Sequence, residues 1–237
     1  MFDFSNKVIV VTGAAGNLGK AVVTAALRSN GRVCGLDHKT GRLGYVTQEV
    51  LGQGTFLPIE DIDINDHGMI REAVKQIQIS LGDIDVVVNT IGGFTAGERV
   101  HEISTESWQR MMALNVHSVL NAAAAFIPEM EKNKRGKFIA VGARAALNGG
   151  AKMGSYAASK SAMLRLIESM AAELKSANIQ VNCVLPGTIN TPQNRQAMPN
   201  ADPSNWVSPM EIAQVVLFLA SSMADVITGA AIPVYGR

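Results

Sequence analysis

Charged and aromatic residues are both scarce in this chain of 237 residues. Asp, Glu, Lys and Arg make up 17% of it, against about 25% in an average globular protein. The 21 Lys and Arg residues nearly cancel the 20 Asp and Glu residues, and no run of basic residues occurs. Such a surface does not attract nucleic acid or an anionic membrane. We therefore expect neither as a partner, and expect a small-molecule substrate instead.

The low aromatic content, 5%, means that the interior is built mainly from Ala, Val, Ile, Leu and Met. Hydrophobic residues reach 47% of the chain, which excludes a disordered protein. A low share of charged residues at this length also indicates that part of the surface is buried between subunits. We therefore expect a homo-oligomer.

Cysteine is nearly absent too, since only Cys34 and Cys183 occur, both in apolar runs. This usage supports neither a disulfide framework nor a metal site. Asp3 and Asn6 interrupt the apolar residues near the start, which argues against a signal peptide. The uncharged stretch from Met111 to Pro128 carries polar side chains and predicts a buried, Ala-rich helix instead of a membrane span. We therefore expect a cytoplasmic protein.

Short β-branched runs alternate with longer helical patterns along the chain. Several runs, such as Val8–Val11 and Val86–Val88, are apolar at consecutive positions, which is typical of parallel strands covered on both faces. The alternation predicts an α/β fold, a doubly wound and mostly parallel seven-stranded sheet with helices on both faces. Strands are expected at Lys7–Thr12, Arg32–Leu36, Thr55–Ile59, Ile84–Asn89, Lys137–Val141, Gln180–Leu185 and Ala231–Val234, and helices near Leu18–Ser29, His67–Ser80, Thr105–Met130, Ser155–Ala177 and Pro209–Ala220.

No linker or internal repeat divides the sequence, so we expect residues 1–237 to form one domain. One long irregular connection, residues 191–207, is rich in Pro, Asn and Met. Long connections inside compact domains are often functional. We interpret this one as a substrate-binding loop that covers a site.

A glycine-rich turn follows the first expected strand. Gly13, Gly16 and Gly19 are each separated by two residues, and Asn17 and Leu18 precede the last glycine. Glycines at such a turn permit a tight bend and a close approach to a pyrophosphate, and the following helix offers free N–H groups. An ordinary strand-to-helix turn can use the same residues, so the motif alone is weak. We interpret all five residues as a dinucleotide-binding turn.

Asp37 strengthens this interpretation because it closes the second expected strand, about 20 residues after the turn. A carboxylate there can accept hydrogen bonds from the adenosine ribose hydroxyls, and it repels a 2′-phosphate. The sequence therefore predicts NAD as the cofactor, with NADH preferred over NADPH. Lys39 and Arg42 follow closely and leave the use of NADP open.

The later motifs resemble the short-chain dehydrogenase/reductase family over essentially the whole chain. They are Asp63, Asn89 followed by Gly92, Leu114-Asn115-Val116, Tyr156-Ala157-Ala158-Ser159-Lys160 and Pro186-Gly187-Thr188-Ile189-Asn190-Thr191. Each motif is common by chance, but their order along the chain is not. The resemblance implies a Rossmann fold that binds NAD(P) and a catalytic group of Tyr156, Lys160 and Asn115. It also implies cofactor contacts from Asp63, Asn89, Gly92, Tyr156, Lys160, Pro186, Gly187, Ile189 and Thr191.

Tyr156 and Lys160 lie four residues apart, so on a helix they share one face. A tyrosine hydroxyl has an ordinary pKa of about 10, and we expect the ammonium group to lower it. We also expect Ser155 to cap the helix, which would put Tyr156 near the positive end of its dipole. By resemblance, Tyr156 protonates the substrate as hydride arrives, and Asn115 holds a water on a proton relay to Lys160. Without the other motifs, Tyr156 and Lys160 would be interpreted as an ordinary pair on a helix surface, and Asn115 as a residue that completes the hydrogen bonds of a helix kink.

The position that matches the family's catalytic serine holds Ala143. Loss of one such hydrogen-bond donor costs about 10²–10³ in rate where an oxyanion must be stabilised. Dihydropteridine reductases also lack this serine, and the turn Gly92-Gly93-Phe94 resembles theirs; their quinonoid substrate forms no alkoxide. We expect Phe94 and Trp206 to stack on such a ring, although loop aromatics more often simply pack. Ala143 and Arg144 are expected to line the same substrate site.

The sequence thus predicts an NAD(P)H-dependent short-chain oxidoreductase that reduces a quinonoid dihydropterin or a similar conjugated ring. The alternative is a carbonyl or 3-oxoacyl-thioester reductase in which Arg144 or a backbone group replaces the serine. A second alternative is a non-catalytic sensor that binds NAD(P). The helices expected at Thr105–Met130 and Ser155–Ala177 are rich in Ala, Met and Leu, and we expect subunits to pair through them. The family resemblance implies that such pairing gives a homodimer or a homotetramer.

Overall fold

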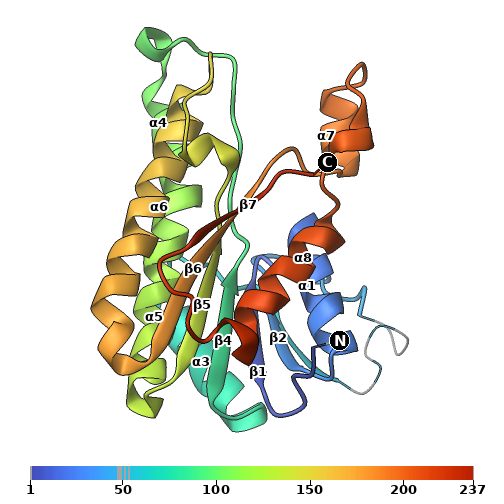
Figure 1. The fold of residues 1–237 in the computed structure, drawn as a ribbon, viewed down its shortest axis with the longest axis vertical. Helices are drawn as coiled ribbons and strands as arrows, with labels where there is room; N and C mark the ends of the chain where they lie inside the picture. Colours follow the sequence, from blue (N-terminus) through green and yellow to red (C-terminus); the bar gives the residue numbers. More distant parts are fainter. Residues whose placement is uncertain (1, 47–49, 51, 53, 237) are drawn as a thin grey trace.

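The middle of the molecule is a seven-stranded sheet. The structure, a computed structural model, describes residues 2–46, 50, 52 and 54–236. The strands are β1 (Val8–Thr12), β2 (Arg32–Leu36), β3 (Thr55–Ile59), β4 (Ile84–Asn89), β5 (Gly136–Val141), β6 (Ile179–Pro186) and β7 (Ala231–Val234). Their order is β3-β2-β1-β4-β5-β6-β7, and each pairing between these strands is parallel (Figure 1). The predicted doubly wound sheet is confirmed, and it is parallel throughout instead of mostly parallel.

Helices cover both faces of this sheet because its central strands are apolar at consecutive positions. All residues of β1 and β4 are buried. On one face lie α1 (Asn17–Arg28) and α8 (Pro209–Ala220), and on the other lie α3 (His67–Ser80), α5 (Ser118–Asn133) and α6 (Gly154–Leu174) (Figure 1). Each face therefore has its own hydrophobic core, and the sheet is held rigidly between them.

The helix expected over Thr105–Met130 changes its pitch in the middle. Its segments are α4 (Thr105–Met112), a π-helical turn (Ala113–His117) and α5. At the end of the turn the Ser118 N–H donates to the Ala113 carbonyl, five residues back. π turns of this kind occur mostly at functional sites, and this one contains Asn115.

The helical run from Thr105 to Asn133 is long and apolar enough, by length and composition alone, to cross a membrane. In this structure 44% of the apolar window within it is buried. Phe126 and Met130 are fully covered in the core over the sheet. These are the contacts of a core helix, and core helices pass the same test of length and composition.

The segment 191–207, expected to be irregular, contains helical structure. Thr191 caps α7 (Pro192–Ala197), because its hydroxyl accepts a backbone N–H of the first turn. Asp202 caps a 3-10 turn (Pro203–Asn205) in the same way. We call residues 191–207 the lid; α7 projects from the body of the molecule beside the C-terminus (Figure 1).

The winding of the sheet reverses between β1 and β4, since β2 and β3 lie on one side of β1 and the later strands on the other. In open parallel sheets, ligand sites form at the carboxyl ends of the strands at this switch point. The glycine-rich turn after β1 and Gly92 after β4 both lie there. The fold therefore brings together two motifs that are far apart in the sequence.

Candidate active site

The turn between β1 and α1 requires glycine at two positions. Gly13 has φ +69°, and a Cβ on Gly19 would lie 2.2 Å from the Gly13 carbonyl oxygen. Gly16 is the N-cap residue of α1, and no side chain caps this helix end. The first N–H groups of α1 can therefore face an anion, as the dinucleotide interpretation requires.

Asp37 is fixed beside this turn, with 4% of the residue exposed. Its Oδ2 accepts the Ala15 N–H at 3.0 Å. Its Oδ1 lies 3.2 Å from Nη1 of Arg42 and 3.4 Å from Nδ1 of His38. The predicted ribose acceptor is thus held by the turn on one side and paired with a guanidinium on the other.

A cavity of about 520 Å³ runs along these groups. It is lined by Thr12, Gly13, Gly16, Leu36, Asp37, His38, Arg42, Ile62, Asp63, Ile64, Asn65, Thr90, Ile91, Gly92 and Leu114. This set fits a dinucleotide, because a glycine backbone and an uncapped helix end suit a pyrophosphate, a carboxylate suits ribose hydroxyls and isoleucines suit an adenine ring. Of the predicted cofactor residues, Gly13, Gly16, Asp37, Asp63 and Gly92 line it.

Three other predicted cofactor residues support the cavity from behind. Asn89 is buried, and its Oδ1 accepts the Thr12 hydroxyl at 2.5 Å. Leu18 packs into the core between α1 and the sheet, and Gly19 packs on Gly13. Asn89, Leu18 and Gly19 thus fix the shape of the turn, whereas the lining residues named above face the cavity.

Asn17 faces the lid, since its Nδ2 donates to Oε1 of Gln193 on α7 at 2.7 Å. Four further predicted cofactor residues lie at the end of β6 and after it: Pro186 is the last residue of the strand, and Gly187, Ile189 and Thr191 follow it. The Gly187 N–H donates to the Val234 carbonyl at 3.0 Å, so this loop is anchored on β7. The four residues lie outside the lining of the 520 Å³ cavity and lead from β6 into the lid.

Tyr156 and Lys160 project from the first turns of α6. The helix begins at Gly154 with Met153 as its N-cap residue, and no side chain caps it. The expectation that Ser155 is the cap is wrong, because Met153 and not Ser155 has the non-helical backbone, with φ −123° and ψ 23°. Tyr156 still lies in the first turn, near the positive end of the helix.

Lys160 is almost fully buried, with 4% of the residue exposed. Its Nζ donates to the Val141 carbonyl at 2.9 Å. Burial lowers the pKa of Lys160 to about 8, and the nearby Cys183 acts weakly in the opposite direction. The Lys160 ammonium group therefore donates to the carboxyl end of β5, and it loses its proton above a pH of about 8.

The Tyr156 ring packs edge-on against Phe94, with ring centres 4.9 Å apart and planes at 80°. Burial raises the pKa of Tyr156 to about 12. The expected lowering of this pKa by Lys160 is wrong for this structure, because desolvation outweighs it and the ammonium points to Val141. Tyr156 is protonated at neutral pH, and its raised pKa makes it a weaker acid than an exposed tyrosine.

Asn115 ties three segments together. Its Oδ1 accepts the Gly93 N–H at 2.9 Å, and its Nδ2 donates to the Gly93 carbonyl at 3.1 Å and to Oγ of Ser159 at 3.0 Å. The Ser159 hydroxyl donates in turn to the Tyr156 carbonyl at 2.8 Å. Asn115 therefore joins the π turn, the loop after β4 and α6 around Tyr156; the water relay stays a prediction.

Ala143 occupies the serine position with an extended backbone and 7% of the residue exposed. Its methyl group offers no hydrogen bond. Arg144 follows it and is exposed, and its Cζ lies 5.4 Å from the ring centre of Tyr235. Arg144 thus contacts the segment after β7, a cation–π pair at the rim of the site.

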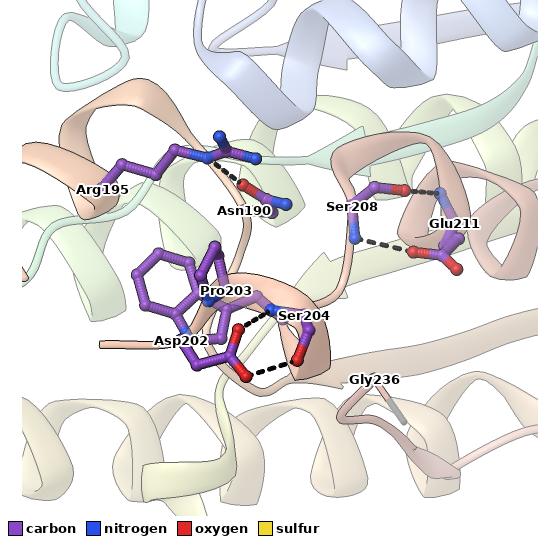
Figure 2. Close-up of a pocket in the computed structure, with 9 residues that line it drawn as sticks. Asn190, Arg195, Asp202, Pro203, Ser204, Ser208, Glu211 and Gly236 are labelled. Carbon is purple, nitrogen blue, oxygen red and sulfur yellow. Dashed lines mark hydrogen bonds between the residues drawn. The ribbon is translucent and has the colours of Figure 1, made fainter. Parts of the chain in front are cut away.

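The two aromatics expected to stack on one ring lie in different places. Phe94 is 61% exposed and covers Tyr156. Trp206 lines a separate cavity of about 450 Å³ against the lid, together with Asn190, Arg195, Asp202, Pro203, Ser204, Ser208, Glu211 and Gly236 (Figure 2). Neither Phe94 nor Tyr156 belongs to that lining. The structure does not bring Phe94 and Trp206 together.

Sequence reasoning missed several residues of the cofactor cavity, among them the polar residues Thr12, His38, Asn65 and Thr90. The Thr90 hydroxyl donates to the Thr12 carbonyl at 2.7 Å, and the Asn65 N–H donates to Asp63 at 2.9 Å. Both residues follow the carboxyl end of a strand, and this position was the signal available in the sequence. Within the described residues, no group of three or more His, Cys, Asp or Glu side chains is placed to hold a metal ion.

Comparisons with known proteins agree with this geometry. A profile of the family described as short chain dehydrogenase matches residues 7–202. The 3-oxoacyl-(acyl-carrier-protein) reductase FabG of Thermotoga maritima is 29% identical over 97% of this chain and 96% of its own. A 3-oxoacyl-(acyl-carrier protein) reductase with bound NAD from Brucella melitensis is 26% identical, with a TM-score of 0.86 over 98% of this chain and 92% of its own. An NADPH-bound short chain oxidoreductase from Pseudomonas aeruginosa, described as containing an atypical catalytic center, is 24% identical over 100% of this chain and 98% of its own; its TM-score of 0.91 shows a shared fold.

Proposed function

We propose that this chain, which belongs to the short-chain dehydrogenase family, reduces the ketone of a 3-oxoacyl thioester or a similar carbonyl compound with NAD(P)H. Membership of the family makes it an NAD(P)-dependent oxidoreductase. One observation carries the proposal: a protonated Tyr156 lies one helical turn from the buried Lys160, beside the Gly92 end of the dinucleotide cavity. The 3-oxoacyl reductases among its relatives support this substrate class.

Tyr156 is the proton donor in this scheme. Its hydroxyl is protonated at neutral pH, as a tyrosine of ordinary pKa would also be, so it can hydrogen-bond the carbonyl oxygen and deliver the proton as that oxygen becomes an alkoxide, which is a stronger base than a phenolate. The reduced nicotinamide, when bound, supplies the hydride. Asn115 keeps α6 and the loop after β4 in place around this hydroxyl.

Lys160 supplies positive charge next to the reacting centre. A Cβ on Gly92 would lie 3.1 Å from Nζ of Lys160, so the lysine reaches the floor of the cavity. There the ammonium group adds positive charge near the place where the alkoxide develops, although it points to the Val141 carbonyl and does not lower the Tyr156 pKa. Above a pH of about 8 this charge is lost, and we expect reduction to slow.

Ala143 leaves the substrate oxygen with one side-chain donor fewer than the family pattern provides. We propose that Tyr156 alone donates to this oxygen, which makes the enzyme a slow ketone reductase. Arg144 is paired with Tyr235 at the rim, and we propose that it contacts a distant anionic part of the substrate and not the reacting oxygen.

For the cofactor we propose that NADH is preferred and NADPH is also used. Asp37 offers a carboxylate at the ribose position and so favours NADH. Arg42, which is paired with that carboxylate, offers positive charge to a 2′-phosphate, so the site also accepts NADPH. This dual use follows from the charges that line the cavity.

Reduction of a quinonoid dihydropterin is the second candidate. Ala143 favours it, because such a ring needs no alkoxide donor, and Phe94 is an exposed aromatic next to Tyr156. The relatives described above give it no support. A sensor without turnover is disfavoured by the retained Tyr156 and Lys160.

The test is the loss of reduced nicotinamide absorbance with purified protein and three substrates: a 3-oxobutanoyl thioester, a simple cyclic ketone and a quinonoid dihydropterin. We expect turnover with the thioester and its abolition in Tyr156→Phe. Turnover with the pterin alone would replace the proposal by the second candidate. Cofactor binding without turnover of any substrate would favour the sensor.

A further inference from the structure

The loop of residues 38–46 is docked against the outside of the glycine-rich turn. The Tyr45 hydroxyl donates to the Ala14 carbonyl at 2.9 Å, and Nη2 of Arg42 donates to the Ala15 carbonyl at 3.4 Å. Nζ of Lys20 lies 4.9 Å from the centre of the Tyr45 ring. These contacts fix the loop against the turn, and its residues His38 and Arg42 line the dinucleotide cavity.

One carboxylate holds this loop from the other side. Glu60 follows β3, and its Oε2 accepts the Gly41 N–H at 2.7 Å while its Oε1 accepts the Leu43 N–H at 2.6 Å. These hydrogen bonds hold the pKa of Glu60 below its usual value, the one from Gly41 contributing most. Because Gly41 and Leu43 flank Arg42, Glu60 fixes the backbone from which the Arg42 side chain extends.

Arg42 carries its guanidinium to the buried Asp37. The Asp37 carboxylate cannot turn away, because its Oδ2 accepts the Ala15 N–H. The Arg42 side chain is 39% exposed and lines the cavity, so it retains donors that face a ligand. A 2′-phosphate at this position meets the repulsion of Asp37 and the attraction of Arg42 together.

We propose that Glu60 sets the choice between NADH and NADPH by holding Arg42 against Asp37. Asp37 accepts the ribose hydroxyls of NADH, and Arg42 offsets part of the repulsion that NADPH would meet. Glu60 touches no cofactor in this scheme and is a positioning residue. The inference rests on the dinucleotide site of the proposed function and adds a residue outside the cavity that controls its specificity.

The test measures dissociation constants of NADH and NADPH by titration calorimetry, without any substrate, for the parent, four single variants and one double variant. In Arg42→Gln we expect NADPH to bind about tenfold more weakly, with NADH changed much less. Glu60→Gln, whose amide oxygen accepts weaker hydrogen bonds, should move the NADPH to NADH ratio in the same direction by a smaller factor. Arg42→Lys should retain part of the NADPH affinity, because it keeps the charge.

Glu98→Gln is the matched control, since its carboxylate also accepts a backbone N–H, that of Ser104 at 3.0 Å, but lies outside the cavity lining. It should leave both dissociation constants unchanged. In Glu60→Gln/Arg42→Gln the two effects should not add, because Glu60 acts only through Arg42. Circular dichroism checks that each variant is folded.

Equal weakening of both cofactors in Glu60→Gln would overturn the inference, because it would leave Glu60 a purely structural role. An unchanged ratio in Arg42→Gln would overturn it as well. Parent protein that binds neither cofactor would refute the proposed function and this inference together. Normal binding without reduction of any ketone would refute only the proposed substrate.

Discussion

At the scale of single residues, a methyl group stands where the family pattern has a serine hydroxyl. Ala143 is nearly buried and has an extended backbone, which a serine adopts equally well. We predict that Ala143→Ser raises kcat/KM for the 3-oxoacyl thioester by at least about tenfold, because it restores a donor to the developing alkoxide.

The measurement compares this variant with Ala143→Val, which adds bulk without a donor and should not gain activity. If the substrate is instead a conjugated ring, Ala143→Ser gives no gain and slightly slows reduction, since it adds an unpaired hydroxyl. That result would contradict the carbonyl reductase proposal.

Lys160 gives a prediction about stability and pH. Its pKa falls from 10.5 to about 8 on folding, so between these values the unfolded chain binds more protons than the folded one. The Lys160 contribution to the free energy of unfolding therefore rises with pH across this window, by at most about 1.4 kcal/mol per pH unit.

At neutral pH the parent holds a buried, charged Lys160, so we predict that Lys160→Met lowers the free energy of unfolding by less than the loss of a hydrogen bond usually does. This compensation should shrink toward pH 10.5, because Lys160 of the folded parent is then uncharged. Urea unfolding of the parent and of Lys160→Met, at several pH values between 8 and 10.5, gives the difference between their free energies of unfolding. Groups that titrate equally in both proteins cancel from this difference. A difference that stays constant with pH would show that the Lys160 pKa is not lowered.

Asp37 gives the prediction for cofactor choice. Removing its carboxylate abolishes the repulsion of a 2′-phosphate and releases Arg42 from its 3.2 Å ion pair. We predict that Asp37→Ala shifts the ratio of kcat/KM values toward NADPH by about tenfold or more. An unchanged ratio would mean that Asp37 does not meet the ribose. Asp63→Ala serves as the control, since it removes another carboxylate from the lining of the same cavity.

At the scale of elements, the turn from β1 to α1 has no room for a side chain at Gly19. A Cβ on Gly19 would lie 2.2 Å from the Gly13 carbonyl oxygen and 2.9 Å from Cα of Ala14. We predict that Gly19→Ala lowers the free energy of unfolding by about 1–3 kcal/mol, because α1 must move away from β1.

Chemical denaturation measures this effect, and calorimetry should show weaker binding of both cofactors by a similar factor. Gly44→Ala is the matched control, since a Cβ there meets nothing within 4 Å. Equal stability of Gly19→Ala and Gly44→Ala would contradict the close approach.

The sheet could be predicted because its strands are buried on both faces and so consist of unbroken apolar runs such as β1 and β4. The helical content of the lid could also have been predicted, since Thr191 followed by Pro192 is a typical helix start. The π turn at Asn115 could not, because it depends on hydrogen bonds to Gly93 and Ser159 that only the folded chain supplies.

The site was predictable where it depends on motifs and not where it depends on contacts between distant residues. The glycine turn, Asp37 and the pair of Tyr156 and Lys160 were found from spacing. The raised pKa of Tyr156 was not, because spacing does not report burial. The hydrogen bonds by which Glu60 holds the backbone on both sides of Arg42 were missed for a similar reason, since neither residue belongs to a recognised motif.

At the scale of the whole molecule, apolar side chains remain exposed on the helices proposed for assembly. Trp108 on α4 and Leu120 on α5 are 43% and 44% exposed. We propose that α4 to α6 pair with a second copy about a two-fold axis. We predict that light scattering gives a mass of two or four times 25.1 kDa, and that Leu120→Glu lowers it.

The matched control is Ile79→Glu on α3, which replaces an apolar side chain that is 87% exposed but lies on another helix. It should leave the mass unchanged. A mass of one chain for the parent protein at micromolar concentration would contradict the assembly.

The position of β1 in the middle of the sheet has a consequence for how the chain folds. Val8 pairs with Arg32 of β2 and also with Ile84 of β4, a partner much farther along the chain. Closing the longer loop costs more chain entropy and is rewarded only when β4 docks. We therefore expect refolding to be slow, with β1, β2 and α1 gaining protection from hydrogen exchange before β5 to β7. Until β4 docks, one side of β1 is an open strand edge, and the chain is then most prone to aggregate.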